Sequence, residues 1–183
     1  ILVIFGATGD LMERKIAPAL YHLHRKNRLP NFFTVIGVAR RNFSDESFRE
    51  HLLRMLKEHK HLSEGAETAK FLELLSYHQG HFEHKDMYAH LKQRVAAVDE
   101  RWGICSNKLF YLAVAPNFYK TIFTHLADSG LTEPCGPDEG WTRVIVEKPF
   151  GKDSQTAHEL DALLVSLFKE EQIYRIDHYL AKE

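Results

Sequence analysis

Short apolar runs alternate along the chain with segments whose apolar residues recur every three or four positions. The runs have the length of strands, and the most apolar ones are typical of strands buried on both faces of a parallel sheet. The predicted strands lie at 1–5, 34–39, 76–82, 109–114, 144–146 and 173–175. No repeat and no low-complexity segment interrupts this alternation.

The intervening segments have the apolar spacing of amphipathic helices. The predicted helices lie at 10–26, from 44 to about 56, and at 66–75, 86–102, 118–126 and 154–168. Pro18 conflicts with the first of them, because a proline inside a helix removes one hydrogen bond. Six strands joined by crossover helices predict an α/β fold, a doubly wound, mostly parallel sheet of the Rossmann-like, dinucleotide-binding kind.

Composition narrows the class of protein. Hydrophobic residues make up 44% of the 183 residues and charged ones 27%, with a net charge of −1, which is ordinary for a globular domain. No basic excess indicates nucleic acid or an anionic membrane as a partner. The apolar start is too short to span a bilayer and no secretory signal precedes it, so we expect a cytoplasmic protein.

Cysteines and histidines give no sign of a metal site. Cys105 and Cys135 lack the spacing of a zinc motif, and in the cytoplasm we expect both thiols to be reduced. His78, His81 and His84 recur every third residue, but alternation along an extended segment points His78 and His81 apart. We therefore predict no metal.

A glycine turn follows the first predicted strand and opens the first helix. Residues 6–11 read Gly-Ala-Thr-Gly-Asp-Leu. Glycines at Gly6 and Gly9 allow a tight turn and a close approach of backbone N–H groups to a pyrophosphate at the helix N-terminus. The spacing is Gly-x-x-Gly rather than Gly-x-Gly-x-x-Gly, so a turn that simply caps a helix is the alternative.

Two arginines follow the second predicted strand, where NAD-specific sites usually carry an acid for the ribose hydroxyl. Arg40 and Arg41 stand there, and the first acid after them is Asp45. Guanidinium groups suit a 2′-phosphate, which favours NADP. Exposed arginines without a ligand are the alternative, and use of NAD as a second cofactor is left open.

Two further motifs lie toward the C-terminal end of the sequence. Residues 147–151 read Glu-Lys-Pro-Phe-Gly and follow a strand, at the sheet edge where ligands bind. Lys148 there can reach a phosphate, a sugar hydroxyl or the cofactor, or it can be an ordinary surface lysine. Residues 175–183 read Arg-Ile-Asp-His-Tyr-Leu-Ala-Lys-Glu, and helical spacing puts His178 and Lys182 on one face, beside Tyr179, as donors for a phosphate.

The glycine turn, the segment 147–151 and the terminal motif, in this order and spacing, resemble the glucose-6-phosphate dehydrogenase family. The terminal motif of that family differs from 175–183 only by a glycine in place of Ala181. The resemblance implies oxidation of glucose 6-phosphate at C1 to 6-phosphogluconolactone with hydride transfer to NADP, the first step of the oxidative pentose phosphate pathway. It also implies a cis bond before Pro149. The residues it implies for the cofactor are Gly6, Ala7, Thr8, Gly9, Asp10, Leu11, Lys15, Arg40, Arg41, His81, Phe82, Pro116, Tyr119 and Lys148.

For glucose 6-phosphate the resemblance implies contacts to Lys148, His178, Tyr179 and Lys182. Lys148 and Asp177 are the expected catalytic residues, Asp177 by supporting a histidine general base of a second domain. We expect 1–176 to be the NADP-binding domain and 177–183 to begin a substrate-binding α+β domain that is otherwise missing. That domain would also make a homodimer or homotetramer, and the fragment alone is expected to be inactive. The rival hypotheses are a non-catalytic NADP-binding sensor and a fragment that binds nothing well.

Overall fold

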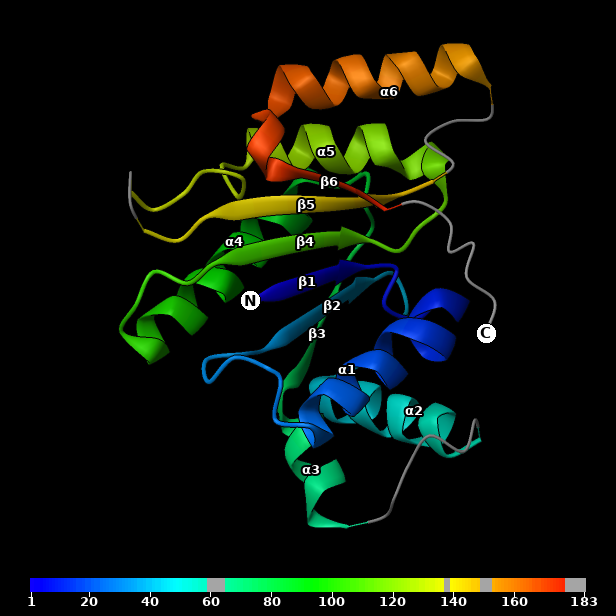
Figure 1. Ribbon diagram of the computed structural model, residues 1–183, viewed down its shortest axis with the longest axis vertical. Helices are drawn as coiled ribbons and strands as arrows, with labels where there is room; N and C mark the ends of the chain where they lie inside the picture. Colours follow the sequence, from blue (N-terminus) through cyan, green and yellow to red (C-terminus); the bar gives the residue numbers. More distant parts are fainter. Residues whose placement is uncertain (59–64, 137–138, 149–152, 177–183) are drawn as a thin grey trace.

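A computed structural model describes residues 1–58, 65–136, 139–148 and 153–176. Within these ranges the chain forms one sheet of six strands (Figure 1). The strands are β1 (Leu2–Phe5), β2 (Val35–Ala39), β3 (Leu75–Gln79), β4 (Lys108–Leu112), β5 (Thr142–Glu147) and β6 (Ile173–Ile176). Their order is β3-β2-β1-β4-β5-β6, and each neighbouring pair is parallel. The predicted doubly wound fold is confirmed, and the order in which successive strands join the sheet reverses between β1 and β4.

The helices lie on both faces of the sheet. They are η1 (Met12–Ile16), α1 (Ala17–Arg25), α2 (Asp45–Glu58), α3 (Ala66–Glu73), α4 (Lys85–Trp102), η2 (Pro116–Phe118), α5 (Tyr119–Asp128), α6 (Ser154–Leu167) and η3 (Glu170–Gln172). In Figure 1, α1, α2 and α3 lie at the β3 end of the sheet, while α5 and α6 lie beside β5 and β6. Among the described helices, none combines the length and the apolar character needed to cross a membrane.

The side chains of β1 point alternately to the two faces of the sheet, and the core accordingly has two layers. Val3 and Phe5 belong to the cluster that includes the buried faces of α4, α5 and α6, whereas Leu2 and Ile4 belong to the cluster that includes those of α1, α2 and α3. Val3, Ile4 and Phe5 are fully buried. A strand covered on both faces must be apolar at every position, which is the pattern at the start of the sequence.

The predicted helix over 10–26 forms from residue 10 to Arg25, but it is not a regular α-helix throughout. A π-helical segment, η1, precedes α1, which has Pro18 in its first turn. The Ala17 N–H bonds the Met12 carbonyl, five residues back. A π-turn before proline changes the hydrogen-bonding ladder at the place where proline cannot donate.

The expectation of two reduced thiols is wrong in this structure, because Cys105 and Cys135 form a disulfide. The two residues are 30 positions apart in sequence. Cys105 follows α4 and precedes β4, while Cys135 lies between α5 and β5. Because β4 and β5 are parallel neighbours, the two connections meet at the amino ends of these strands.

Candidate functional site

A pocket of about 300 Å³ lies at the carboxyl ends of the strands, where β1 meets β4. In doubly wound sheets this reversal of strand order is where dinucleotides bind. The predicted cofactor-binding residues that line it come from three separate segments and are Gly6, Thr8, Gly9, Arg40, Arg41, His81 and Phe82. The fold therefore brings the glycine turn and the two arginines to one cavity.

The glycine turn fits closely against the end of β4. Gly6 has a φ of +84°, a left-handed conformation that side chains disfavour. A Cβ atom at Gly6 would also overlap the backbone carbonyl oxygen of Ala113. The Gly6 N–H donates to the Val38 carbonyl at 2.8 Å, and the Gly9 N–H donates to the Gly6 carbonyl at 3.0 Å. The turn is thus held against β2 and β4 at the entrance to the first helix.

The arginine turn after β2 is braced by β3. The Tyr77 hydroxyl lies 2.9 Å from the Ala39 carbonyl and 2.7 Å from the Arg41 carbonyl, either of which it can donate to. The Gly80 N–H donates to the Ala39 carbonyl at 3.0 Å. Burial raises the pKa of Tyr77 to about 12, despite the opposing charge of Arg41. The hydroxyl therefore keeps its proton and acts as a donor at neutral pH.

One wall of the pocket is aromatic. The Phe82 ring packs edge-on against Phe5 and Phe118, and the Tyr88 hydroxyl donates to the Phe82 carbonyl at 2.9 Å. His81 lines the pocket beside it, whereas a ring nitrogen of His78 lies 3.0 Å from the Met87 carbonyl. His81 is thus at the pocket, whereas His78 is held by a backbone carbonyl outside the pocket lining.

Other predicted cofactor residues lie around the glycine turn but do not line the pocket as described. Ala7 is fully buried in the core, and Leu11 packs against the same apolar cluster. Asp10 and Lys15 are exposed on the first helical turns. Their roles stay predictions, since a bound dinucleotide extends beyond the part of the surface that is hollow.

Tyr119 and Lys148 also lie at the carboxyl side of the sheet. Tyr119 is 2% exposed and packs against Phe123, and its hydroxyl lies 3.4 Å from the Glu147 carbonyl. Pro116 begins η2, directly after the pocket-lining Ala115. Lys148 is exposed at the end of β5, and its N–H donates to the Ile176 carbonyl at 3.1 Å. It stands at the correct edge for a ligand, outside the pocket lining.

A tyrosine–carboxylate pair next to Lys148 was missed in the sequence analysis. The Tyr111 hydroxyl donates to a carboxylate oxygen of Glu147, across β4 and β5. Burial, and then this hydrogen bond, raise the pKa of Tyr111. The pair fixes the Glu147 side chain one residue before Lys148.

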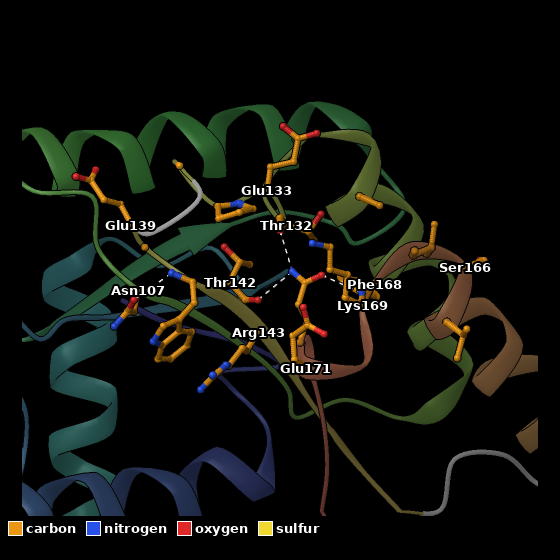
Figure 2. Close-up of a pocket in the computed structure, with 18 residues that line it drawn as sticks. Asn107, Thr132, Glu133, Glu139, Thr142, Arg143, Ser166, Phe168, Lys169 and Glu171 are labelled. Atoms are coloured by element: carbon orange, nitrogen blue, oxygen red, sulfur yellow. Dashed lines mark hydrogen bonds between the residues drawn. The ribbon is translucent and has the colours of Figure 1, made fainter.

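A larger hollow of about 840 Å³ lies at the opposite edge of the sheet (Figure 2). It is lined by residues at the amino ends of β4 and β5, including Asn107 and Thr142, and by the segment after α6. Gln172 donates hydrogen bonds to the carbonyls of Thr132 and Thr142 at 3.2 and 3.0 Å, and Figure 2 draws such bonds between lining residues as dashed lines. Of the predicted site residues within the described ranges, none lines it.

Comparison with known proteins decides the family. The model of the family "Glucose-6-phosphate dehydrogenase, NAD binding domain" matches residues 3–183. The chain belongs to the glucose-6-phosphate dehydrogenase family. It is 41% identical to glucose-6-phosphate 1-dehydrogenase of Chlamydia muridarum and 42% identical to that of Aggregatibacter actinomycetemcomitans, in both cases over 100% of this chain.

Solved structures of the family share the fold. A structure described as glucose-6-phosphate dehydrogenase in complex with its substrate glucose-6-phosphate matches 100% of this chain with a TM-score of 0.84 and 38% identity. The enzyme from Mycobacterium avium matches 96% of the chain with a TM-score of 0.81 and 31% identity. The chain spans only 37% and 36% of the two curated relatives and 37% and 35% of these two structures.

Membership in the family implies a nicotinamide dinucleotide cofactor. The pocket fits such a group: Gly6 and Gly9 line it without side chains, so the backbone there can approach a pyrophosphate. Among its described lining residues the charged ones are Arg40, Arg41 and Glu83, so positive charge prevails. These features suit the phosphates of a dinucleotide.

Several predicted residues lie outside the described ranges. Pro149 with its predicted cis bond is among them, as are the four residues of the terminal motif, Asp177, His178, Tyr179 and Lys182. Their roles stay predictions from the sequence.

Sequence reasoning missed some of the pocket lining. Ala113 and Val114 follow β4, and Glu83 follows β3, at the same carboxyl edge as the predicted residues. The rule that ligands bind at this edge applies to every strand end, so the end of β4 could have been included. Glu83 lies four residues beyond β3, and no pattern in the sequence marks it.

Proposed function

We propose that this chain is the coenzyme domain of an NADP-dependent glucose-6-phosphate dehydrogenase. The observation that carries the proposal is the joint lining of one pocket by the Gly6–Gly9 turn and by Arg40 and Arg41. The turn suits the pyrophosphate, and the guanidinium groups suit the 2′-phosphate that distinguishes NADP from NAD. The one acid among the described lining residues, Glu83, leaves positive charge in excess.

The rest of the reaction follows from the family. In the proposed reaction glucose 6-phosphate is oxidised at C1 to the lactone, and the bound nicotinamide supplies a hydride acceptor. Lys148 would position the substrate at the carboxyl edge of β5, and His178, Tyr179 and Lys182 would hold its phosphate. Asp177 would orient a histidine general base of a second domain. The similarity to a structure that contains glucose 6-phosphate supports this substrate.

We also propose that residues 1–176 are the NADP-binding unit and that 177–183 begin the substrate domain. The sheet described here, whose last strand ends at Ile176, supports this boundary. A non-catalytic NADP sensor would bind the same cofactor, so it is distinguished by turnover, not by cofactor binding.

Calorimetric titration of Arg40→Ala with NADP and with NAD tests the cofactor. We expect NADP binding to weaken by about 1.5–3 kcal/mol, the range for hydrogen bonds to charged groups, and NAD binding to change little. Arg28→Ala is the matched control, because Arg28 is exposed and does not line the pocket. Equal losses for both cofactors would exclude a 2′-phosphate role for Arg40.

Tyr77→Phe tests whether the brace on the arginine turn matters for NADP. Loss of the hydroxyl frees the Ala39 and Arg41 carbonyls from their common donor, so we expect NADP binding to weaken by roughly 0.5–1.5 kcal/mol, more than NAD binding. Tyr21→Phe is the control: Tyr21 is equally buried, and its hydroxyl contacts Thr68, on α3. The brace has no role in recognition if both variants bind NADP like the parent protein in calorimetry.

A further inference from the structure

The disulfide between Cys105 and Cys135 lies against a buried cation. The Lys108 ammonium is 3.8 Å from the Cys105 sulfur and 3.7 Å from the Cys135 sulfur. It forms an ion pair with Asp99 at 2.8 Å and donates to the Ser106 carbonyl at 2.9 Å. The Lys108 side chain is only 8% exposed. A lysine so deeply buried is unusual, and here both its charge partner and its position beside the two sulfurs are defined.

Asp99 holds the Lys108 ammonium in place and weakens its electrostatic effect on the two sulfurs. Its other carboxylate oxygen accepts from the Ser106 N–H at 3.1 Å. Burial alone would raise the pKa of Asp99, but hydrogen bonds from Lys108 and Ser106 outweigh it and lower that pKa. The carboxylate therefore stays ionised at neutral pH, and it partly neutralises the ammonium that faces the sulfurs.

The same atoms have the composition of a metal site, but Lys108 takes the place of the ion. One oxygen of Asp99 and the sulfurs of Cys105 and Cys135 lie within 4.8 Å of one another. The ammonium is in contact with all three residues. A divalent cation there would be repelled by the lysine, whereas sulfur anions would be stabilised by it. The arrangement thus favours thiolate chemistry over metal binding.

We infer that Cys105 and Cys135 form a reversible thiol–disulfide exchange site whose co-reactant is a dithiol or its disulfide. The site lies at the amino ends of β4 and β5, at the opposite edge of the sheet from the cofactor pocket, so it goes beyond the proposed dehydrogenase function. Lys108 stabilises the thiolates of the reduced form, and a stabilised reduced form makes a disulfide easier to reduce.

The exchange follows from which sulfur is accessible. Cys135 is exposed and Cys105 is half-buried, so a thiolate of the dithiol attacks the Cys135 sulfur. The protein S–S bond breaks, and Cys105 leaves as a thiolate beside Lys108. The second thiol of the reagent then attacks the mixed disulfide and releases Cys135. Two electrons pass to the protein cysteines, the proton of the second thiol passes to Cys135, Cys105 stays a thiolate beside Lys108, and the dithiol becomes a disulfide.

The larger hollow lies beside Cys135. Its neighbours Pro134 and Gly136 line that hollow, as does Gly140 on the other side of the loop. A Cβ atom at Gly140 would approach the Cys105 sulfur to 2.7 Å, so this loop packs directly against the half-buried cysteine.

Equilibration of the purified protein in mixtures of reduced and oxidised dithiothreitol tests this site. After alkylation, mass spectrometry counts the free thiols. Both cysteines should be reduced together and reoxidised together. Lys108→Met removes the cation and leaves the Asp99 charge facing the sulfurs, which disfavours the thiolates. The ratio of reduced to oxidised dithiothreitol at half-reduction should therefore rise about tenfold, the change that corresponds to a thiol pKa raised by one unit. Asp99→Asn should lower that ratio, because the cation is no longer neutralised.

Opposite shifts separate an electrostatic role from a structural one. If Lys108 and Asp99 only held the loops together, losing either would move the midpoint in the same direction, and that result would overturn the inference. Lys108→Arg, which keeps the charge, should restore most of the Lys108→Met shift. Far-ultraviolet circular dichroism identifies variants that fail to fold. If Lys108→Met does not fold, the direction of the midpoint shift in Asp99→Asn decides the test alone. Cysteines that alkylate fully under oxidising conditions, or that resist a large excess of dithiothreitol, would also exclude the site.

Discussion

Replacing Gly6 by alanine is expected to lower the free energy of unfolding by roughly 3–5 kcal/mol and to abolish detectable NADP binding. The new Cβ would overlap the Ala113 carbonyl, and the φ of +84° disfavours any side chain. To remove the overlap, the turn must move away from the end of β4. Backbone N–H groups that approach a pyrophosphate only in this geometry would then be displaced. Urea denaturation and calorimetry with NADP measure the two effects.

Gly103→Ala is the matched control for this variant. Gly103 ends α4 with a φ of +65°, but an added Cβ there meets no atom within 4 Å. Its loss of stability should be about 1–2 kcal/mol, the cost of the left-handed conformation alone, with NADP binding unchanged. If Gly6→Ala is no more destabilised than Gly103→Ala and still binds NADP, the close fit at the glycine turn is unimportant.

Much of the fold could be predicted because strands buried on both faces must be apolar throughout. Residues 1–5 and 35–39 have no polar side chain, and both segments contain strands in the interior of the sheet, β1 and β2. The pocket could be predicted in outline for a related reason. Parallel strands end at one edge, so the turn at Gly6 and the arginines after Ala39 had to meet there. Glycine and arginine also have chemistry specific enough to suggest phosphates.

What the sequence could not show are contacts between side chains from different strand connections. Nothing in the spacing of Tyr77 indicates that its hydroxyl supports the turn after β2, because β3 follows two helices later. Cys105 and Cys135 meet only because β4 and β5 are neighbours. The general rule that thiols stay reduced in the cytoplasm predicted no disulfide between them. The π-turn before Pro18 likewise depends on packing around the proline, and composition predicts only that a regular helix is disturbed there.

The 183 residues as given are expected to bind NADP but to form no measurable NADPH from glucose 6-phosphate. The proposed role of Lys148 is to contact the substrate from the end of β5, whereas the proposed general base is a histidine of a second domain. Absence of a general base typically costs about 10²–10⁴-fold in rate. Lys148 is exposed in the described structure, and an anion held at an open edge stays hydrated and screened, which weakens every charged contact.

Absorbance of NADPH at saturating glucose 6-phosphate measures this directly, in the given chain and in a version extended through the second domain of its relatives. Calorimetry with NADP provides the control, since both proteins should bind the cofactor with similar affinity if the pocket is complete within the described fold. Asp177→Asn in the extended protein should lower kcat with little change in NADP binding, because the proposed role of Asp177 is to orient the base. Robust turnover by the short chain would show that the base lies within residues 1–183. Asp177 or one of the chain's own histidines would then have to take that role, and turnover by the chain alone would also exclude the non-catalytic sensor.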